Sequence, residues 1–214
     1  MNTIALNYLV PNVFADADLS QSAIWNKVVS FSKGSHYLIA AESGTGKSSL
    51  FDYIYGRRND YSGTLTVDGN DITKLPNADK QKIRREQLSV VFQGFRLFPE
   101  LTAWENIMLK NKLTNHKAED EIEQLFEQLG IAEKKDKPLA KLSFGQQQRV
   151  AIIRALCQPF DFLMLDEPFS HLDDQNIQIA LSLILQETKK QQAGLMLCTL
   201  GNDYNLPSAN KLYL

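Results

Sequence analysis

The chain has 214 residues, of which 43% are hydrophobic, and it carries a formal net charge of −2 with an isoelectric point near 5.9. This length and composition suit one large domain, or a core that carries a subdomain. The charge balance does not favour nucleic-acid binding, for which only a local basic face would remain. The N-terminus lacks a signal-peptide pattern, and no apolar run approaches the roughly 20 residues that cross a bilayer. We therefore expect a soluble protein that reaches a membrane only through a partner.

The patterns in the first half of the chain predict strands around one helix. Apolar or alternating runs predict strands at residues 37–41, 63–67 and 88–92. Residues 48–55 predict a helix that ends at Gly56, and Asp68-Gly69 predicts a turn.

The second half continues the alternation of strands and helices. Helical spacing of apolar residues predicts a helix over 117–129, and a second helix is expected after residue 168. Short apolar runs predict strands at 162–165, 195–199 and 211–214. Cys157 and Cys198 lie in apolar stretches, so we interpret them as reduced core thiols of a cytosolic protein.

This order of elements predicts an α/β fold with a mainly parallel sheet. The mostly helical segment 94–157 is expected to be an inserted subdomain. The core would then comprise about residues 1–93 and 158–214 of a single domain that spans 1–214.

Residues 41–48, Ala-Glu-Ser-Gly-Thr-Gly-Lys-Ser, match the phosphate loop G-x-x-x-x-G-K-[ST], except that Ala41 replaces the first glycine. The two glycines can adopt positive φ and direct backbone N–H groups toward an anion, and the following helix adds its positive N-terminal end. The lysine is expected to reach the β- and γ-phosphates, and the serine hydroxyl to bind Mg²⁺. The loop therefore predicts a site for ATP with Mg²⁺, formed by Ser43, Gly44, Thr45, Gly46, Lys47, Ser48 and Ser49.

Asp166 and Glu167 close a predicted apolar strand. Beside a phosphate loop, Asp166 would bind Mg²⁺ and Glu167 would orient and deprotonate the attacking water. The alternative is a solvated pair of carboxylates at a turn, which the phosphate loop makes much less favoured.

Residues 142–149, Leu-Ser-Phe-Gly-Gln-Gln-Gln-Arg, follow a pattern in which Ser143 caps a helix N-terminus. With the two motifs above, this segment resembles the Leu-Ser-Gly-Gly-Gln signature of ATP-binding cassette (ABC) ATPases. The resemblance implies that Ser143, Gly145 and Gln146 contact a nucleotide held by the opposite subunit. Phe144 stands where the family has a glycine.

The resemblance covers nearly the whole chain and implies an N-terminal antiparallel β part. Gln93 matches the glutamine loop, which places it near Mg²⁺ and the attacking water, and Asp173 matches the D-loop residue that contacts the opposite subunit. Phe14 precedes the phosphate-loop lysine at the distance of the aromatic that stacks on adenine; Tyr8 is a second candidate, and an ordinary core position is the alternative for Phe14.

One departure from the family pattern is expected to affect the rate of ATP hydrolysis. The family carries a switch histidine after Thr in the position that Leu200 occupies here. Leucine cannot donate a hydrogen bond to a γ-phosphate, and losing such a donor typically costs on the order of 3 kcal/mol in the transition state. Nucleotide binding is expected to suffer less than hydrolysis.

The resemblance implies the ATPase subunit of an ABC transporter, similar to the lipoprotein-release, macrolide-export and cell-division branch. It would form a homodimer or paired cassette on ATP binding and couple to a separate transmembrane permease. It would therefore lie in the cytoplasm at the inner face of the cell membrane. The permease is expected to dock near the glutamine loop, where the apolar residues Phe95, Leu97 and Phe98 are either exposed or part of the core. Two alternatives stay open: a degenerate cassette that binds ATP as a switch, and a soluble DNA-repair or translation ATPase.

Overall fold

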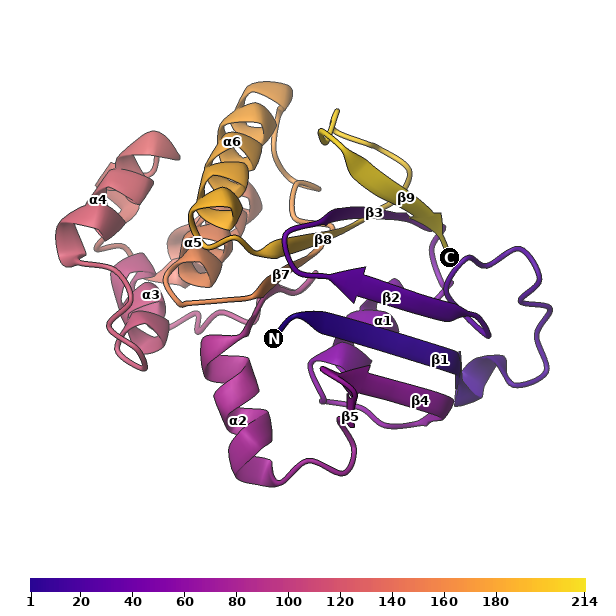
Figure 1. The fold of residues 1–214 in the computed structure, drawn as a ribbon. Helices are drawn as coiled ribbons and strands as arrows, with labels where there is room; N and C mark the ends of the chain where they lie inside the picture. Colours follow the sequence, from indigo (N-terminus) through magenta and orange to yellow (C-terminus); the bar gives the residue numbers. More distant parts are fainter.

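The computed structural model describes residues 1–214 and contains two sheets (Figure 1). The smaller sheet is antiparallel, with strand order β2-β1-β4-β5, and its strands are β1 (Thr3–Pro11), β2 (Val28–Ser32), β4 (Tyr61–Val67) and β5 (Asn70–Asp71). The larger sheet is parallel, with order β6-β7-β8-β3-β9, and comprises β6 (Leu88–Val91), β7 (Phe162–Asp166), β8 (Gly194–Thr199), β3 (His36–Ala40) and β9 (Ala209–Tyr213). The predicted parallel core with an N-terminal antiparallel part is confirmed.

Six α-helices connect these strands. They are α1 (Lys47–Ile54), α2 (Asn77–Glu86), α3 (Ala103–Asn111), α4 (Glu119–Gln128), α5 (Phe144–Leu156) and α6 (Asp174–Lys190). The three helices α3, α4 and α5 fall within residues 94–157 and gather at the end of the molecule away from β9 (Figure 1). No helix is both long and apolar enough to cross a bilayer.

The parallel sheet is the middle layer of the molecule. Successive residues of each strand point to opposite faces of the sheet, and both faces are covered. In β7, Leu163 and Leu165 pack with the helices α3 to α6, whereas Phe162 and Met164 pack with α1 and the antiparallel sheet. The same alternation holds in β3 and β8. Burial on both faces explains why these strands are continuous apolar runs in the sequence.

The predicted elements agree with the structure to within a few residues, but helices α2 and α3 were missed, and strands β1, β2 and β5 were not located individually. Only Ile83 is buried in α2, so this surface helix has no apolar periodicity to detect. Helix α3 begins at a capping box in which Thr102 and Glu105 bond each other's backbone N–H groups, a signal that the interpretation did not use. Both cysteines are buried and free, as expected.

Candidate functional site

The loops that follow β3, β6 and β7 converge because the carboxyl ends of parallel strands meet at one edge of the sheet. A cleft of about 280 Å³ opens there. Its walls are the phosphate loop, the segment Val13–Phe14, Gln93 and Glu167. The structure thus brings together most of the residues that the sequence analysis assigned to the nucleotide.

The phosphate loop has the conformation that its glycines permit. Gly44 and Gly46 have φ of 86° and 97°, and Gly46 is the N-cap of α1. The N-terminal end of α1 therefore adds partial positive charge to the cleft. Every predicted loop residue from Ser43 to Ser49 lines the cleft except Thr45, whose hydroxyl instead donates to the Glu42 carbonyl oxygen at 2.9 Å.

Lys47 is buried inside this loop. Its Nζ donates to the carbonyl oxygens of Ala41 and Glu42 at 2.9 and 3.0 Å, and lies 3.5 Å from Oε1 of Glu167. The ammonium group is thereby held between the loop and the acid that follows β7. This places one positive charge where the cleft would receive a phosphate chain.

Asp166 ends β7 beside the phosphate loop. Its Oδ2 accepts a hydrogen bond of 2.7 Å from the Ser48 hydroxyl, whereas its buried Oδ1 has no partner. Burial raises the pKa of Asp166, which the Ser48 bond only partly offsets.

These oxygen atoms fit a hard divalent cation such as Mg²⁺. The chain contains no group of three or more His, Cys, Asp or Glu side chains placed to hold a metal ion by themselves, so a cation here would also need ligands of other types. Ser48 and Asp166, with Gln93 in the same cleft, are therefore the best-placed protein ligands for a cation that also binds phosphate oxygens.

Glu167 lies at a turn after β7, beside the cleft. Its φ is 50°, a left-handed conformation that non-glycine residues rarely adopt and that is often found at functional sites. Its N–H donates to the Cys198 carbonyl oxygen at 3.1 Å, which fixes the turn to β8. The carboxylate then lies in the cleft with Lys47 and Gln93, where a general base could face a water molecule.

The signature segment forms the predicted cap of α5. Ser143 Oγ accepts from the Gln146 N–H at 3.3 Å, and Gln146 Oε1 accepts from the Ser143 N–H at 3.0 Å. Asp173 caps α6 with its side chain alone, as its Oδ1 accepts from the Asn176 N–H at 2.8 Å. None of Ser143, Gly145, Gln146 and Asp173 lines the phosphate cleft of its own chain.

Two neighbours of this cap show how closely the segments pack. A Cβ atom on Gly145 would lie 2.6 Å from the His171 carbonyl oxygen, so only glycine allows α5 to approach the D-loop this closely. The adjacent Phe144 is 66% exposed, and its ring centroid lies 5.4 Å from that of His171. The Phe144 side chain, which departs from the family pattern, therefore projects outward and leaves the cap intact.

Gln148 is a residue of the site that the sequence analysis missed. It is fully buried; its Nε2 donates to the Glu167 carbonyl oxygen at 3.2 Å and to Ser170 Oγ at 3.3 Å, and its Oε1 accepts from His171 N–H at 3.0 Å. The signature helix is thereby tied to the loop that carries Glu167 and to the D-loop. The available signal was its spacing of three from Gly145, which places both on one helix face.

The two aromatic candidates for adenine stacking lie in different places, and Leu200 lies on the surface. Phe14 lines the phosphate cleft and packs against Gly46, whereas Tyr8 is 63% exposed and lies outside the cleft. Leu200 is 63% exposed just beyond β8, in a turn where Gly201 N–H donates to Thr199 Oγ1 at 2.8 Å.

Of the two alternatives for Phe95, exposed or part of the core, the structure shows the core position. Phe95 is buried in the helical core with its ring 6.2 Å from His171, because the chain reverses at Phe95 and Arg96, which both have positive φ. Arg154 holds this turn by donating to both of their carbonyl oxygens at 2.6 Å. Phe98 is exposed, and Leu97 is partly buried against the core.

A parallel sheet with a phosphate loop after β3 and an acidic pair at the end of β7, one strand (β8) away, defines a P-loop nucleoside triphosphatase. The family model described as "ABC transporter" matches residues 26–170. The chain belongs to this family, and it is an ABC-type ATPase.

Known proteins of this family resemble the chain over most of its length. The uncharacterized ABC transporter ATP-binding protein Rv0986 of Mycobacterium tuberculosis is 33% identical over 87% of this chain and 76% of its own length. The lipoprotein-releasing system ATP-binding protein LolD of Legionella pneumophila is 32% identical over 80% and 77%. Among solved structures, a dimer of the cassette MJ0796 in a post-hydrolysis state with ADP and Pi has a TM-score of 0.80 and 25% identity, covering 99% of this chain and 94% of that one.

Proposed function

We propose that this chain drives a membrane transporter by binding Mg²⁺-ATP between two copies of itself, or between itself and a paired cassette. The proposal rests on the buried Asp166. One of its carboxylate oxygens accepts a hydrogen bond from the Ser48 hydroxyl, and the other oxygen has no partner. The adjacent Glu167 lies next to the Lys47 ammonium. This arrangement supplies a cation ligand and a phosphate ligand within one cleft. A nucleotide without its cation would leave the Asp166 oxygen unsatisfied.

The residues of the cleft take distinct roles in this proposal. Backbone N–H groups of the phosphate loop and Lys47 bind the phosphates, and Phe14 stacks on the adenine. Ser48, Gln93 and Asp166 hold Mg²⁺, which when bound offsets the charge on the phosphate oxygens. Glu167 accepts the proton of the attacking water, and Gln93 orients that water.

Head-to-tail pairing follows from the signature segment. Ser143, Gly145, Gln146 and Asp173 lie outside the cleft of their own chain, at the N-terminal ends of α5 and α6. Helix N-terminal ends favour anions, so these ends suit a γ-phosphate presented by a second subunit. The similar cassette MJ0796 is dimeric in its structure with ADP and Pi, which supports pairing of two cassettes.

A groove beside the glutamine loop suits a separate permease. It encloses about 210 Å³ between β6, α3 and α5, and its walls combine aromatic residues with two cations: Tyr55, Phe92, Phe98, Leu109, Lys110 and Arg154. Phe98 and Leu109 are exposed at its rim. Docking here would place the chain at the inner face of the cell membrane through its partner.

Sedimentation of the Glu167→Gln variant tests the pairing. With Mg²⁺-ATP we expect a dimer, because slow hydrolysis traps the closed state, and we expect a monomer without nucleotide. The Lys47→Ala variant is the matched control and should stay monomeric, since it loses ATP binding. A Glu167→Gln protein saturated with ATP that remains monomeric would contradict the pairing.

A second candidate function is an ATP-dependent switch with little hydrolysis. The exposed Leu200 in place of a hydrogen-bond donor is the observation that favours it. Steady-state phosphate release separates the two candidates, because a switch would bind ATP tightly and release phosphate at the background rate.

A further inference from the structure

Trp25 is a buried residue beside the phosphate loop that none of the motifs assigns. Its side chain is 1% exposed, and it comes from the segment between β1 and β2, twenty residues before the loop. Its indole Nε1–H donates a hydrogen bond of 2.9 Å to the carbonyl oxygen of Thr45. A buried indole N–H requires such a partner, and here that partner is the backbone of the phosphate loop.

This hydrogen bond fixes the orientation of one peptide unit. The Thr45 carbonyl and the Gly46 N–H belong to the same peptide, and the chain contains no cis peptide bond. In a trans peptide the C=O and N–H groups point in opposite directions. Holding the carbonyl toward Trp25 therefore turns the Gly46 N–H away from Trp25, and no group of the chain accepts a hydrogen bond from that N–H.

Nothing else in the loop's own sequence fixes this peptide. Gly44 and Gly46 flank Thr45 with φ of 86° and 97°, and glycine populates both signs of φ with similar ease. A flip of the 45–46 peptide would point a carbonyl oxygen, rather than an N–H, at a bound anion. The glycines that make the loop possible thus also leave it free to adopt the wrong orientation.

Packing holds the indole in place on both sides. A Cβ atom on Gly46 would lie 3.1 Å from Cζ2 of Trp25 and 3.0 Å from Cε2 of Phe14, so both rings pack closely against Gly46. The ring of Tyr53 on α1 meets the indole edge-on at 6.5 Å. At the backbone, buried Ser22 accepts the Trp25 N–H at 2.8 Å and fixes the turn that presents the indole.

We propose that Trp25 is a positioning residue for ATP binding: its indole N–H holds the Thr45–Gly46 peptide so that the Gly46 N–H faces the phosphate chain. This inference rests on the proposed binding of ATP by the loop. It makes the segment before β2 part of the phosphate site, although that segment carries no phosphate-binding motif.

The first test replaces Trp25 by Phe, which keeps an aromatic ring and removes the donor. We expect the Kd for Mg²⁺-ATP, measured by isothermal titration calorimetry, to rise about fivefold to tenfold, the effect of losing one hydrogen bond. Trp104→Phe is the matched control, because Trp104 lies on α3 against Phe126 and far from the loop in the fold; its Kd should stay within twofold of wild type.

Two further measurements address the possibilities that the Trp25→Phe variant fails to fold or that the indole has a purely structural role. 3-Benzothienylalanine at position 25 keeps the bicyclic shape and lacks only the N–H, and it should weaken ATP binding by the same factor. In the Trp104→Phe protein, the single remaining indole N–H resonance in a ¹⁵N spectrum should shift when Mg²⁺-ATP saturates the site. Unchanged affinity in the benzothienyl protein, or an indole resonance that does not move, would overturn the inference. Wild-type protein that binds no ATP would instead overturn the proposed function itself.

Discussion

Asp166 is a buried carboxyl group beside the phosphate loop. Burial raises the pKa of its carboxyl group, and only one oxygen is hydrogen-bonded. Because the folded-state pKa lies above the unfolded value, stability falls as the pH rises through the pKa of Asp166. An adjacent cation would reverse this cost, since opposite charge favours the ionised form.

We therefore predict opposite effects of Asp166→Asn on the free and the nucleotide-bound protein. The melting temperature without nucleotide should rise at pH 7, because the buried charge is gone. The added stabilisation by Mg²⁺-ATP over ATP with EDTA should disappear, and phosphate release should fall by about a hundredfold or more. Differential scanning fluorimetry in both conditions measures this, and an Mg²⁺-dependent shift that survives in the variant would exclude Asp166 as a ligand.

Leu200 stands where a hydrogen-bond donor would be expected to speed hydrolysis. It is exposed beyond β8, so a histidine there has room to turn toward the cleft. We expect Leu200→His to raise steady-state phosphate release tenfold or more, up to the roughly hundredfold value of one transition-state donor. Leu200→Ala should leave the rate unchanged. If both variants hydrolyse ATP at the wild-type rate, another group already fills the role of the missing histidine.

The sequence located the residues of the site that belong to contiguous motifs, but not those that act across the chain. Lys47, Ser48, Asp166 and Glu167 were assigned because strand–loop–helix order determines where such residues meet. Trp25 was not found, because its role depends on contact with a carbonyl oxygen twenty residues away. Only the folded backbone defines such a partner. Gln148 was missed for the same reason.

At the scale of elements, the close approach of α5 to the D-loop depends on Gly145. A methyl group there would lie 2.6 Å from the His171 carbonyl oxygen. We predict that Gly145→Ala lowers the free energy of unfolding by about 1–3 kcal/mol through overpacking, even though alanine is the better helix former. Gly94→Ala is the control, because no atom lies within 4 Å of its Cβ position. Equal urea midpoints for the two variants would show that α5 can shift without cost.

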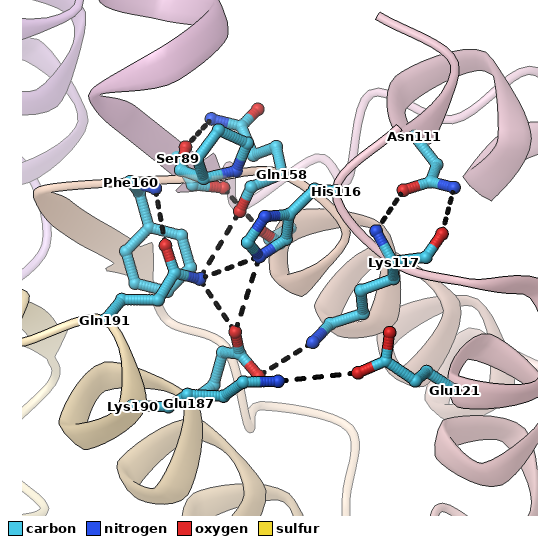
Figure 2. Close-up of polar contacts among 12 residues, drawn as sticks. Ser89, Asn111, His116, Lys117, Glu121, Gln158, Phe160, Glu187, Lys190 and Gln191 are labelled. Atoms are coloured by element: carbon cyan, nitrogen blue, oxygen red, sulfur yellow. Dashed lines mark hydrogen bonds and ion pairs between the residues drawn. The ribbon is translucent and has the colours of Figure 1, made fainter. Parts of the chain in front are cut away.

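A buried ion pair joins α6 to the segment between α3 and α4 (Figure 2). Lys117 Nζ donates to Glu187 Oε2 at 2.8 Å, Gln191 Nε2 donates to Oε1 at 2.8 Å, and His116 Nε2 lies 3.6 Å from Oε1. Burial alone would raise the pKa of Glu187, but the hydrogen bonds of His116 and Lys117 outweigh it and lower the pKa to about 2. The pair thus anchors the helical segment to the core helix.

This pKa predicts a specific pH dependence. Because it lies below the ordinary value of 4.5, the stabilisation by Glu187 is fully present above pH 4.5 and is lost as the pH falls toward 2. Glu187→Gln should lower the free energy of unfolding at pH 7 by on the order of 3 kcal/mol, and the difference from wild type should shrink below pH 4.5. Glu123→Gln, at an exposed ion pair with Lys135, should change little. A pH-independent difference would contradict the assignment.

The elements that the sequence missed were those whose formation is governed by their surroundings. Helix α2 lies on the surface with one buried residue, so its pattern resembles a polar loop. The buried parallel strands were found because both of their faces are covered, so each contains a continuous run of apolar residues. Boundaries differed by a few residues because helix and strand ends depend on local caps.

At the scale of the whole molecule, we propose that a second chain completes the cleft. The phosphate loop, Asp166, Glu167 and Gln93 surround one side of it, whereas the signature cap of α5 and the D-loop lie elsewhere on the same chain. The resemblance to known cassettes predicted this division, but the residues alone could not, because no sequence pattern states which surfaces of two copies meet. We therefore propose a hydrolytic site that is shared between two subunits.

Steady-state phosphate release from wild type and from Glu167→Gln, measured over a range of protein concentrations, tests this claim most directly. We predict wild-type turnover per subunit that rises with protein concentration as dimers form, and a fall of about a hundredfold or more in Glu167→Gln with ATP affinity retained. Equal near-background rates in the two proteins, with tight ATP binding in both, would contradict the account.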